Sequence, residues 1–315
     1  GMDEAGDANK SYKININKLD TKTYSKSLTT NYEITNQFDN ADVKLYEGTK
    51  DQFKDYKYLS RSNWKDTYPL KSTSMDCSNE KMILDMQYTH IIEEDKDLKM
   101  PTFGKSGSLS LLSMYGLDYD DPQWESLLDQ VTWQEAVTLA TYGGGTAGCV
   151  SVNAPDALAK DGPGGINQGN NNLPNIMCFP SECLMAATFN EELIEELGNA
   201  FGMEIMHVGY TGIYGPGANI HRSAYSGRNW EYYSEDGFIS GKMLAREVKG
   251  LQNRGVIVFT KHFLLNDQER NRYGVSVFAN EQSIREIYLM AFEDGVTEGK
   301  MNGMMSSFNR IGCIW

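Results

Sequence analysis

The chain has 315 residues, and its 40% hydrophobic content suffices for one large core and a second, smaller one. A formal net charge of −14 and an isoelectric point near 4.8 argue against nucleic acid and anionic membrane surfaces, because both need clustered Lys and Arg. No apolar run approaches the roughly 20 residues of a transmembrane helix, and the N-terminal residues lack the features of a signal peptide. We therefore expect a cytoplasmic protein with neither nucleic acid nor a membrane as partner.

Residues 1–118 show the two-residue alternation of half-exposed strands. Apolar and polar residues alternate at 11–17, 31–35 and 42–46, and Asn, Asp, Thr and Ser lie between these runs. The run 82–92 fits either a strand or a short helix. We predict that residues 1–118 form a β-rich accessory segment and linker, separate from a second domain at 119–315.

Helical patterns begin at Asp121, which we expect to cap a helix whose first residue is Pro122. Thr132 and Glu135 have capping-box spacing and predict a second helix at 132–142. Further helices are predicted from Asn190, from near Ser234 and at 281–296. Their apolar stripes are, in chain order, Leu193, Leu197 and Phe201; Phe238, Leu244, Val248 and Leu251; and Ile284, Ile287, Tyr288 and Phe292.

Three glycines after the second helix invite a nucleotide-binding interpretation. Gly143, Gly145 and Gly148 have the G-x-G-x-x-G spacing of a dinucleotide loop. That loop leaves a strand and opens a helix, whereas these glycines follow a predicted helix and precede a strand-like run at 149–153. We favour a turn that ends the helix, with a phosphate or dinucleotide enzyme as the alternative.

The cysteines indicate neither disulfides nor a metal site. They are odd in number and contain no C-x-x-C pair, so we expect free, buried thiols and no metal or other cofactor. The cysteines are Cys77, Cys149, Cys178, Cys183 and Cys313.

The richest polar stretch follows the run 256–259, which is apolar without alternation, as expected for a strand buried on both faces. Lys261 and His262 come next, at the carboxyl end of this strand, where barrel and doubly wound folds bind their ligands. The stretch 261–272 offers many donors, several carboxylates and few apolar groups. Such a surface suits a ligand made of hydroxyls.

Asp161 and Arg228 are further candidates, each with a structural alternative. Asp161 precedes Gly-Pro-Gly-Gly, so its carboxylate either accepts two hydroxyl hydrogen bonds or merely starts the turn. Arg228 offers five fixed donors to sugar oxygens or a carboxylate, or it pairs with Glu231 or Glu235. For His221 we favour a hydrogen-bonded structural role, because no second histidine stands at metal spacing.

Six motifs in one order resemble glycoside hydrolase family 3, the retaining β-glucosidase and β-xylosidase group. The resemblance covers about residues 121–309. The motifs are DGPGGI at 161–166, FPSECLMAATFN at 179–190, GPGANIHR at 215–222, GRNWEYYSED at 227–236, KHFLLNDQERNR at 261–272 and MMSSFN at 304–309. Two positions depart from the family pattern, because Asn167 stands where Arg is common and Phe308 where Tyr is usual.

The resemblance implies an α/β fold, a (β/α)8 TIM-like barrel that is truncated at its C-terminal end and preceded by the smaller β-rich segment. Candidate strands lie at 148–152, near Asp161, and at 175–179, 206–214, 255–262 and 303–308, whereas a closed barrel needs eight. An open sheet edge exposes unpaired backbone groups. We therefore expect another segment, a second chain or a swapped partner to complete the barrel.

The resemblance also implies the function. The residues matched to the family's sugar-binding side chains are Asp161, Arg228, Lys261, His262 and Arg272. The family's nucleophile lies on a later strand and its acid/base in a separate domain, so neither is expected in this chain. The resemblance thus predicts retaining, exo-acting hydrolysis of β-linked gluco-oligosaccharides or aryl and alkyl glycosides by a larger enzyme, with this chain inactive alone. A non-catalytic carbohydrate-binding protein is the alternative.

Overall fold

The computed structural model describes residues 38–43, 99–167, 176–224 and 226–314, together with residues 26, 31, 33, 86 and 97. The chain divides into two compact units, Gly1–Gln37 and Phe38–Trp315. In the first unit, Lys26 and Glu33 form an isolated antiparallel bridge. The strand predicted at 11–17 lies outside the described residues, as does most of the runs 31–35 and 82–92. The domain boundary at residue 118 stays a prediction.

The described part of the run 42–46 does not form the predicted strand. Asp42 and Val43 instead follow a short 3-10 helix, η1 (Asp39–Ala41). The carbonyl oxygen of Ala41 accepts a hydrogen bond from the amide of Ala279 at 3.0 Å, which ties this segment to a distant loop. Local alternation did not reveal that long-range contact.

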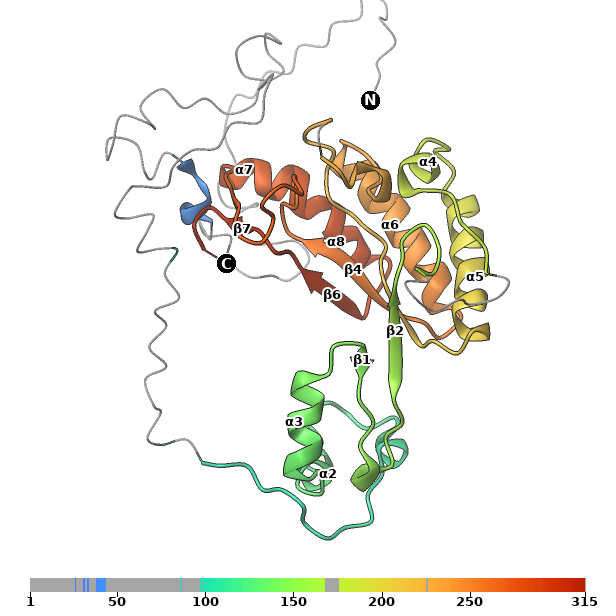
Figure 1. Ribbon diagram of the computed structural model, residues 1–315, viewed down its shortest axis with the longest axis vertical. Coiled ribbons are helices and arrows are strands. Elements are labelled where there is room, and N and C mark those ends of the chain that lie inside the picture. The colour runs from blue at the N-terminus through green and yellow to red at the C-terminus, as the bar shows by residue number, and fades with distance from the viewer. Residues whose placement is uncertain are drawn as a thin grey trace, which may run out of the picture. The chain divides into compact units, whose positions relative to one another are not determined.

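The second unit centres on a five-stranded sheet in the order β1-β2-β3-β4-β6 (Figure 1). The strands are β1 (Gly145–Thr146), β2 (Ala157–Asp161), β3 (Gly212–Tyr214), β4 (Ile257–Phe263) and β6 (Gly303–Ser306). β2, β3, β4 and β6 are parallel and follow chain order, whereas β1 is antiparallel to β2. Consecutive parallel strands joined by helices are the arrangement of part of a (β/α) barrel, which confirms the predicted fold class. β5 (Ser276–Val277) and β7 (Arg310–Ile311) form a separate parallel pair.

Three helices between the parallel strands form the main core with them. They are α5 (Glu191–His207), α6 (Gly237–Gln252) and α8 (Met290–Thr297), and α6 packs against both others. Phe201, Leu244 and Val258 are buried in this core. Asn190 caps α5 as predicted, but α6 is capped by Asp236, whose carboxylate accepts from the amide of Ile239 at 2.8 Å.

The predicted helix stripes are only partly right. Leu193, Phe238 and Ile287 are exposed, although the sequence placed them on buried faces. On α5 the buried face instead runs through Ile194 and Ile205. The last helix contains a π-helical stretch (Ile284–Leu289) between α7 (Glu281–Ser283) and α8, and its wider turn changes which side chains face the core.

A second, smaller core lies at the start of the second unit. It is formed by residues in and around η4 (Leu111–Met114), α2 (Gln123–Leu128), α3 (Trp133–Thr141) and η5 (Val150–Val152). Its buried side chains are Met114, Leu127, Val131, Cys149 and Val152. The capping box at Thr132 is confirmed, since its amide donates to the Glu135 carboxylate at 2.9 Å. The first helix begins one residue later than predicted, with Pro122 at the N-cap position.

The glycine-rich segment is not a phosphate loop, and two predicted strands are wrong. Gly143 and Gly145 lead from α3 into β1 and Gly148 follows it. Gly145 has φ of 135°, and a Cβ there would lie 2.1 Å from the oxygen of Ala157. The predicted strand at 149–153 is a 3-10 helix, since the Glu135 carboxylate accepts from the amide of Ser151 at 3.0 Å. No helix of dinucleotide-loop type opens there. Residues 176–179 likewise lie outside any strand.

The described cysteines are all free, but they are not all buried. Cys149 and Cys313 are buried, whereas Cys178 and Cys183 are exposed on either side of the FPSE turn. Within the described residues, no helix has the length and apolar character needed to cross a membrane.

The contact between α5 and α6 depends on two glycines. A Cβ on Gly198 would lie 2.6 Å from the carbonyl oxygen of Glu247, and one on Gly250 would lie 2.4 Å from that of Glu195. We expect Gly198→Ala to lower the free energy of unfolding by about 3 kcal/mol. Rigid backbone blocks the added methyl group, and overpacking of this kind costs about 1–3 kcal/mol. Urea unfolding measures the loss.

The matched control is Gly143→Ala, at a position where an added Cβ meets no atom within 4 Å. Its unfolding midpoint should stay near that of the parent. A midpoint for Gly198→Ala at or above the control would show that the helices separate without cost, contrary to this expectation.

Candidate functional site

The carboxyl end of β4 carries two buried polar residues. Lys261 is 1% exposed and His262 is 5% exposed. A buried ammonium is costly unless it is paired. Lys261 therefore needs nearby carboxylates. Two are present, Asp161 and Glu231, and each comes from another element of the fold.

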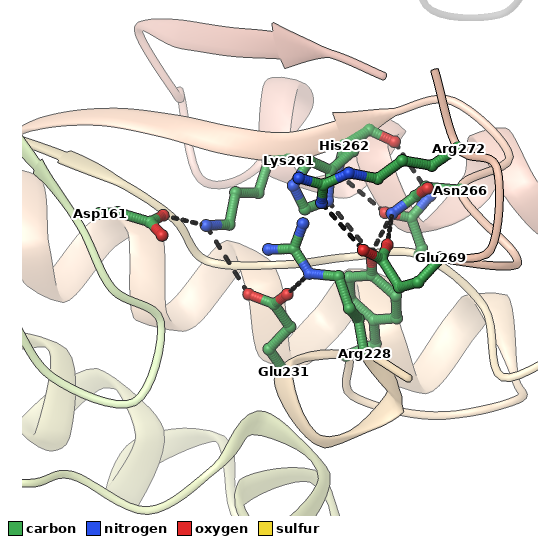
Figure 2. A network of polar contacts seen from close by, with 10 residues as sticks. Asp161, Arg228, Glu231, Lys261, His262, Asn266, Glu269 and Arg272 are labelled. Carbon is green, nitrogen blue, oxygen red and sulfur yellow. Dashed lines mark hydrogen bonds and ion pairs between the residues drawn. The ribbon is translucent and has the colours of Figure 1, made fainter. Parts of the chain in front are cut away.

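Four charged side chains form a line of alternating sign at this strand end (Figure 2). Lys261 Nζ donates to Asp161 Oδ1 at the end of β2, and it lies 3.6 Å from Glu231 Oε2. Glu231 Oε1 accepts from Arg228 Nε. Glu231 is 1% exposed, whereas the side chain of Asp161 is 50% exposed. The outer carboxylate thus faces solvent, and the inner one is enclosed by two cations.

His262 is held from both its backbone and its ring. Asn219 accepts from the His262 amide at 2.8 Å and donates to its carbonyl oxygen at 2.9 Å. The ring Nδ1 lies 3.1 Å from the hydroxyl of Tyr232, which itself accepts from Asn266 at 2.8 Å. The hydroxyl oxygen has two lone pairs and Asn266 takes one, so the contact alone fits either tautomer; we assign the one in which the Tyr232 hydroxyl donates to Nδ1. A neutral ring then presents Nε2–H as a donor.

The electrostatics keep His262 neutral. Burial, together with the positive charges of Arg228, Lys261 and Arg272, lowers its pKa from a usual 6.5 to about 2, and burial is the largest cause. Protonation would therefore require a pH far below the physiological range.

We expect the ring signals of His262 to show no titration between pH 5 and pH 8. In two-dimensional NMR spectra, the 1Hε1 and 13Cε1 shifts should stay constant, while an unperturbed histidine titrates near pH 6.5. Comparison with His262→Gln assigns the signal. An inflection near pH 6 to 7 would contradict a desolvated ring among three cations.

Arg272 approaches the same site from the loop after β4. Its guanidinium donates to Glu269 at 2.8 Å, and Glu269 accepts from Asn266 at 3.2 Å. The guanidinium also lies 5.1 Å from the ring centre of Phe308 and 5.2 Å from that of Tyr273. Arg272 is thus oriented by a carboxylate and two aromatic rings.

The five residues selected from the sequence lie in one network. Figure 2 shows the side chains of Asp161, Arg228, Lys261, His262 and Arg272 around one strand end. Sequence reasoning gave Glu231 only as an ion-pair alternative for Arg228, and that pair is present. It did not identify Glu231 as the link between Arg228 and Lys261. The only sequence signal was the spacing of three residues from Arg228.

The remaining candidate, His221, has a structural role. His221 Nε2 lies 2.7 Å from the carbonyl oxygen of Tyr232, which agrees with the predicted structural histidine. Tyr232 is buried beneath the site, whereas Trp230 is exposed. Among the residues that the structure describes, no group of three or more His, Cys, Asp or Glu side chains is placed to hold a metal ion.

Comparison with known proteins identifies the family. Residues 148–312 match the family described as "Glycosyl hydrolase family 3 N terminal domain". A β-glucosidase of Ruminococcus albus is 38% identical over 178 residues, which are 56% of this chain and 19% of that protein. β-Glucosidase A of Butyrivibrio fibrisolvens is 41% identical over 160 residues, which are 51% of this chain and 19% of that protein. The chain thus spans about a fifth of the length of these relatives.

Solved structures give the same assignment. β-Glucosidase 3B of Thermotoga neapolitana, in complex with α-D-glucose, is 37% identical and superposes with a TM-score of 0.55. The match covers 60% of this chain and 29% of that one. The family match, the parallel strands and the polar strand ends together show that this chain belongs to glycoside hydrolase family 3, as part of its N-terminal domain.

Proposed function

We propose that the network at the ends of β2 and β4 binds one sugar ring. The observation that carries this proposal is the convergence of Asp161, Arg228, Lys261, His262 and Arg272 from distant parts of the chain. Half-exposed Asp161 supplies acceptors, and the neutral ring of His262 and the guanidinium groups supply donors. Sugar hydroxyls both donate and accept, so they fit a mixed set of this kind.

We further propose that the whole protein hydrolyses β-glycosidic bonds, with exo-acting, retaining cleavage of β-D-glucosides or related glycosides. Support comes from relatives named β-glucosidases and from a structure of one of them that holds glucose. The candidate substrates are β-linked gluco-oligosaccharides and aryl or alkyl glycosides. The chain departs from the usual family pattern at Asn167 and Phe308. Substitutions at these two positions would test sugar preference.

We infer that residues outside 1–315 supply the nucleophile and the acid/base. A retaining mechanism needs two reactive carboxyl groups about 5–5.5 Å apart. In the described network, Glu231 is enclosed and its two oxygens face Arg228 and Lys261, so it lacks access to a sugar. Asp161 is accessible but pairs with Lys261, which suits binding rather than nucleophilic attack.

We also propose that further parallel strands cover the free edge of β6. Among the described strands, β6 pairs only with β4. An open edge presents unpaired backbone groups and favours association with another strand. The covering strands belong either to a longer form of the protein or to a second chain. Light scattering of residues 1–315 separates these cases. If a second copy supplies the strands, the mass should be that of a dimer; if a longer form of the protein supplies them, it should be that of a monomer.

A panel of nitrophenyl glycosides tests the proposed function. It is applied to residues 1–315 and to a form extended at both ends, and glucose binding is measured by calorimetry in parallel. Glucose binding by both forms with turnover only by the extended form supports the proposal. Equal turnover by residues 1–315 would show that the catalytic carboxylates lie within them, and binding without turnover in both forms would identify a carbohydrate-binding protein.

A further inference from the structure

Glu231 occupies a position that the sugar-binding proposal does not use. It is the last residue of the 3-10 helix η6 (Asn229–Glu231), and Arg228 is the N-cap residue of that helix. Its carbonyl oxygen packs closely against Gly217, where a Cβ would lie 2.2 Å away, and its amide donates to the carbonyl oxygen of Arg228 at 3.0 Å. Both ends of this residue are therefore held tightly before any ligand arrives.

The two carboxylate oxygens of Glu231 serve different cations. Oε1 accepts from Arg228 Nε, and Oε2 lies 3.6 Å from Lys261 Nζ. Because both oxygens face these cations, the buried carboxylate has none left for a ligand, while the side chain of Arg228 is 18% exposed. Glu231 thus contacts two groups of the site without entering the site itself.

The charge balance explains why a buried carboxylate is stable there. Burial raises the pKa of Glu231, and the hydrogen bond from Arg228 and the charge of Lys261 oppose that rise. Without this carboxylate, Lys261 would keep only Asp161, which is half exposed and would itself contact a sugar. Two like charges, Lys261 and Arg228, would also lie close together without a shared counterion.

We propose that Glu231 is a positioning residue, which holds the Lys261 ammonium and the Arg228 guanidinium in fixed orientations for the hydroxyls of one sugar ring. The proposal rests on the sugar-binding function proposed above. Preorganised donors bind more tightly because fewer side-chain rotamers are lost on binding. Glutamine is the informative substitution, since it keeps the shape but offers a single oxygen, which serves only one of the two cations.

The first measurement is independent of any sugar. In 15N NMR spectra of the full chain, Arg228 Nε–H and Lys261 Nζ should give sharp, slowly exchanging signals. We expect Glu231→Gln to shift the Arg228 Nε–H signal and to broaden the Lys261 Nζ signal. In Glu231→Asp, which keeps both carboxylate oxygens, the two signals should lie closer to those of the parent. Glu235→Gln, an exposed residue of the same segment, is the control. Unchanged Arg228 and Lys261 signals in Glu231→Gln would overturn the proposal.

The second measurement is glucose affinity in a double-mutant cycle. Glu231→Gln should weaken binding about 10-fold or more in the parent but less in a Lys261→Met background, because one of the two groups that Glu231 positions is then absent. An equal loss in both backgrounds would contradict the positioning of Lys261 by Glu231. If the parent binds no glucose while the NMR signals respond as expected, the sugar-site proposal fails and the positioning of the two cations stands.

Discussion

Lys261→Met is expected to weaken glucose binding by residues 1–315 about 100-fold, as measured by calorimetry. Methionine fills a similar volume without the charge, so the sugar loses a charge-assisted hydrogen bond worth about 1.5–3 kcal/mol. The change also removes the cation that lies between Asp161 and Glu231. Asp161 is then free to turn away from the position in which it accepts sugar hydroxyls.

The control for this experiment is Lys249→Met, which removes the same charge from the exposed surface of α6. Lys249 pairs with Glu195 at 3.0 Å, but an exposed pair of this kind contributes little to stability. Its glucose affinity should match that of the parent. If Lys261→Met binds glucose as tightly as Lys249→Met does, Lys261 lies outside the sugar site and the central assignment is wrong.

The second large effect is a loss of stability as the pH rises from about 4.5 to about 7. Burial raises the pKa of Glu247 from 4.5 to about 7, although the hydroxyl of Tyr233, which donates to it at 2.5 Å, opposes the rise. Burial and the neighbouring Glu247 also raise the pKa of Glu182 well above its usual value. At these two sites the folded chain therefore binds more protons than the unfolded chain in this window, so their contribution to stability is fully present below pH 4.5 and is lost as the pH rises.

For Glu247 alone, the shift corresponds to about 3 kcal/mol between the two ends of the window. Urea unfolding followed by tryptophan fluorescence at pH 5 and at pH 8 measures it. Glu135 does not disturb the comparison, because hydrogen bonds from Ser151 lower its pKa to about 2 and its titration lies below the window. Glu247→Gln keeps an acceptor for Tyr233 but has no titrating group, so its stability should depend much less on pH.

Glu192→Gln, at an exposed position of α5, provides the comparison for Glu247→Gln. It should keep the full pH dependence of the parent. A parent chain that becomes more stable between pH 5 and pH 8 would contradict the sign of the effect. An unchanged slope in Glu247→Gln would assign the effect to the other buried carboxyl groups whose pKa values are raised, which are Glu182, Glu231 and Asp267.

The sequence was most informative where a local pattern has one physical meaning. The capping box at Thr132 and the cap at Asn190 each depend on side chains within three residues, and both are present. The strand that ends at Lys261 and His262 was predictable because an unbroken apolar run followed by charged residues is typical of a buried parallel strand. The five site residues came from motif resemblance, and their convergence required the fold.

Long-range contacts explain most of what the sequence did not predict. Ser151 looked like part of a strand, but Glu135 on α3 binds it and folds the segment into a 3-10 helix. Ile287 had helical spacing, but the π-helical stretch turned it outward. Glu231 had a foreseeable partner in Arg228, whereas its approach to Lys261 joins segments 30 residues apart and depends on tertiary structure.

The buried carboxyl pair changes how the folded protein should migrate in an electric field. The formal charge of −14 assumes that every carboxyl group is ionised. With the pKa of Glu247 near 7 and that of Glu182 raised well above 4.5, the native chain retains protons near neutral pH that a denatured chain releases. Native electrophoresis should therefore show a less acidic species than isoelectric focusing in urea, and Glu247→Gln should narrow that difference.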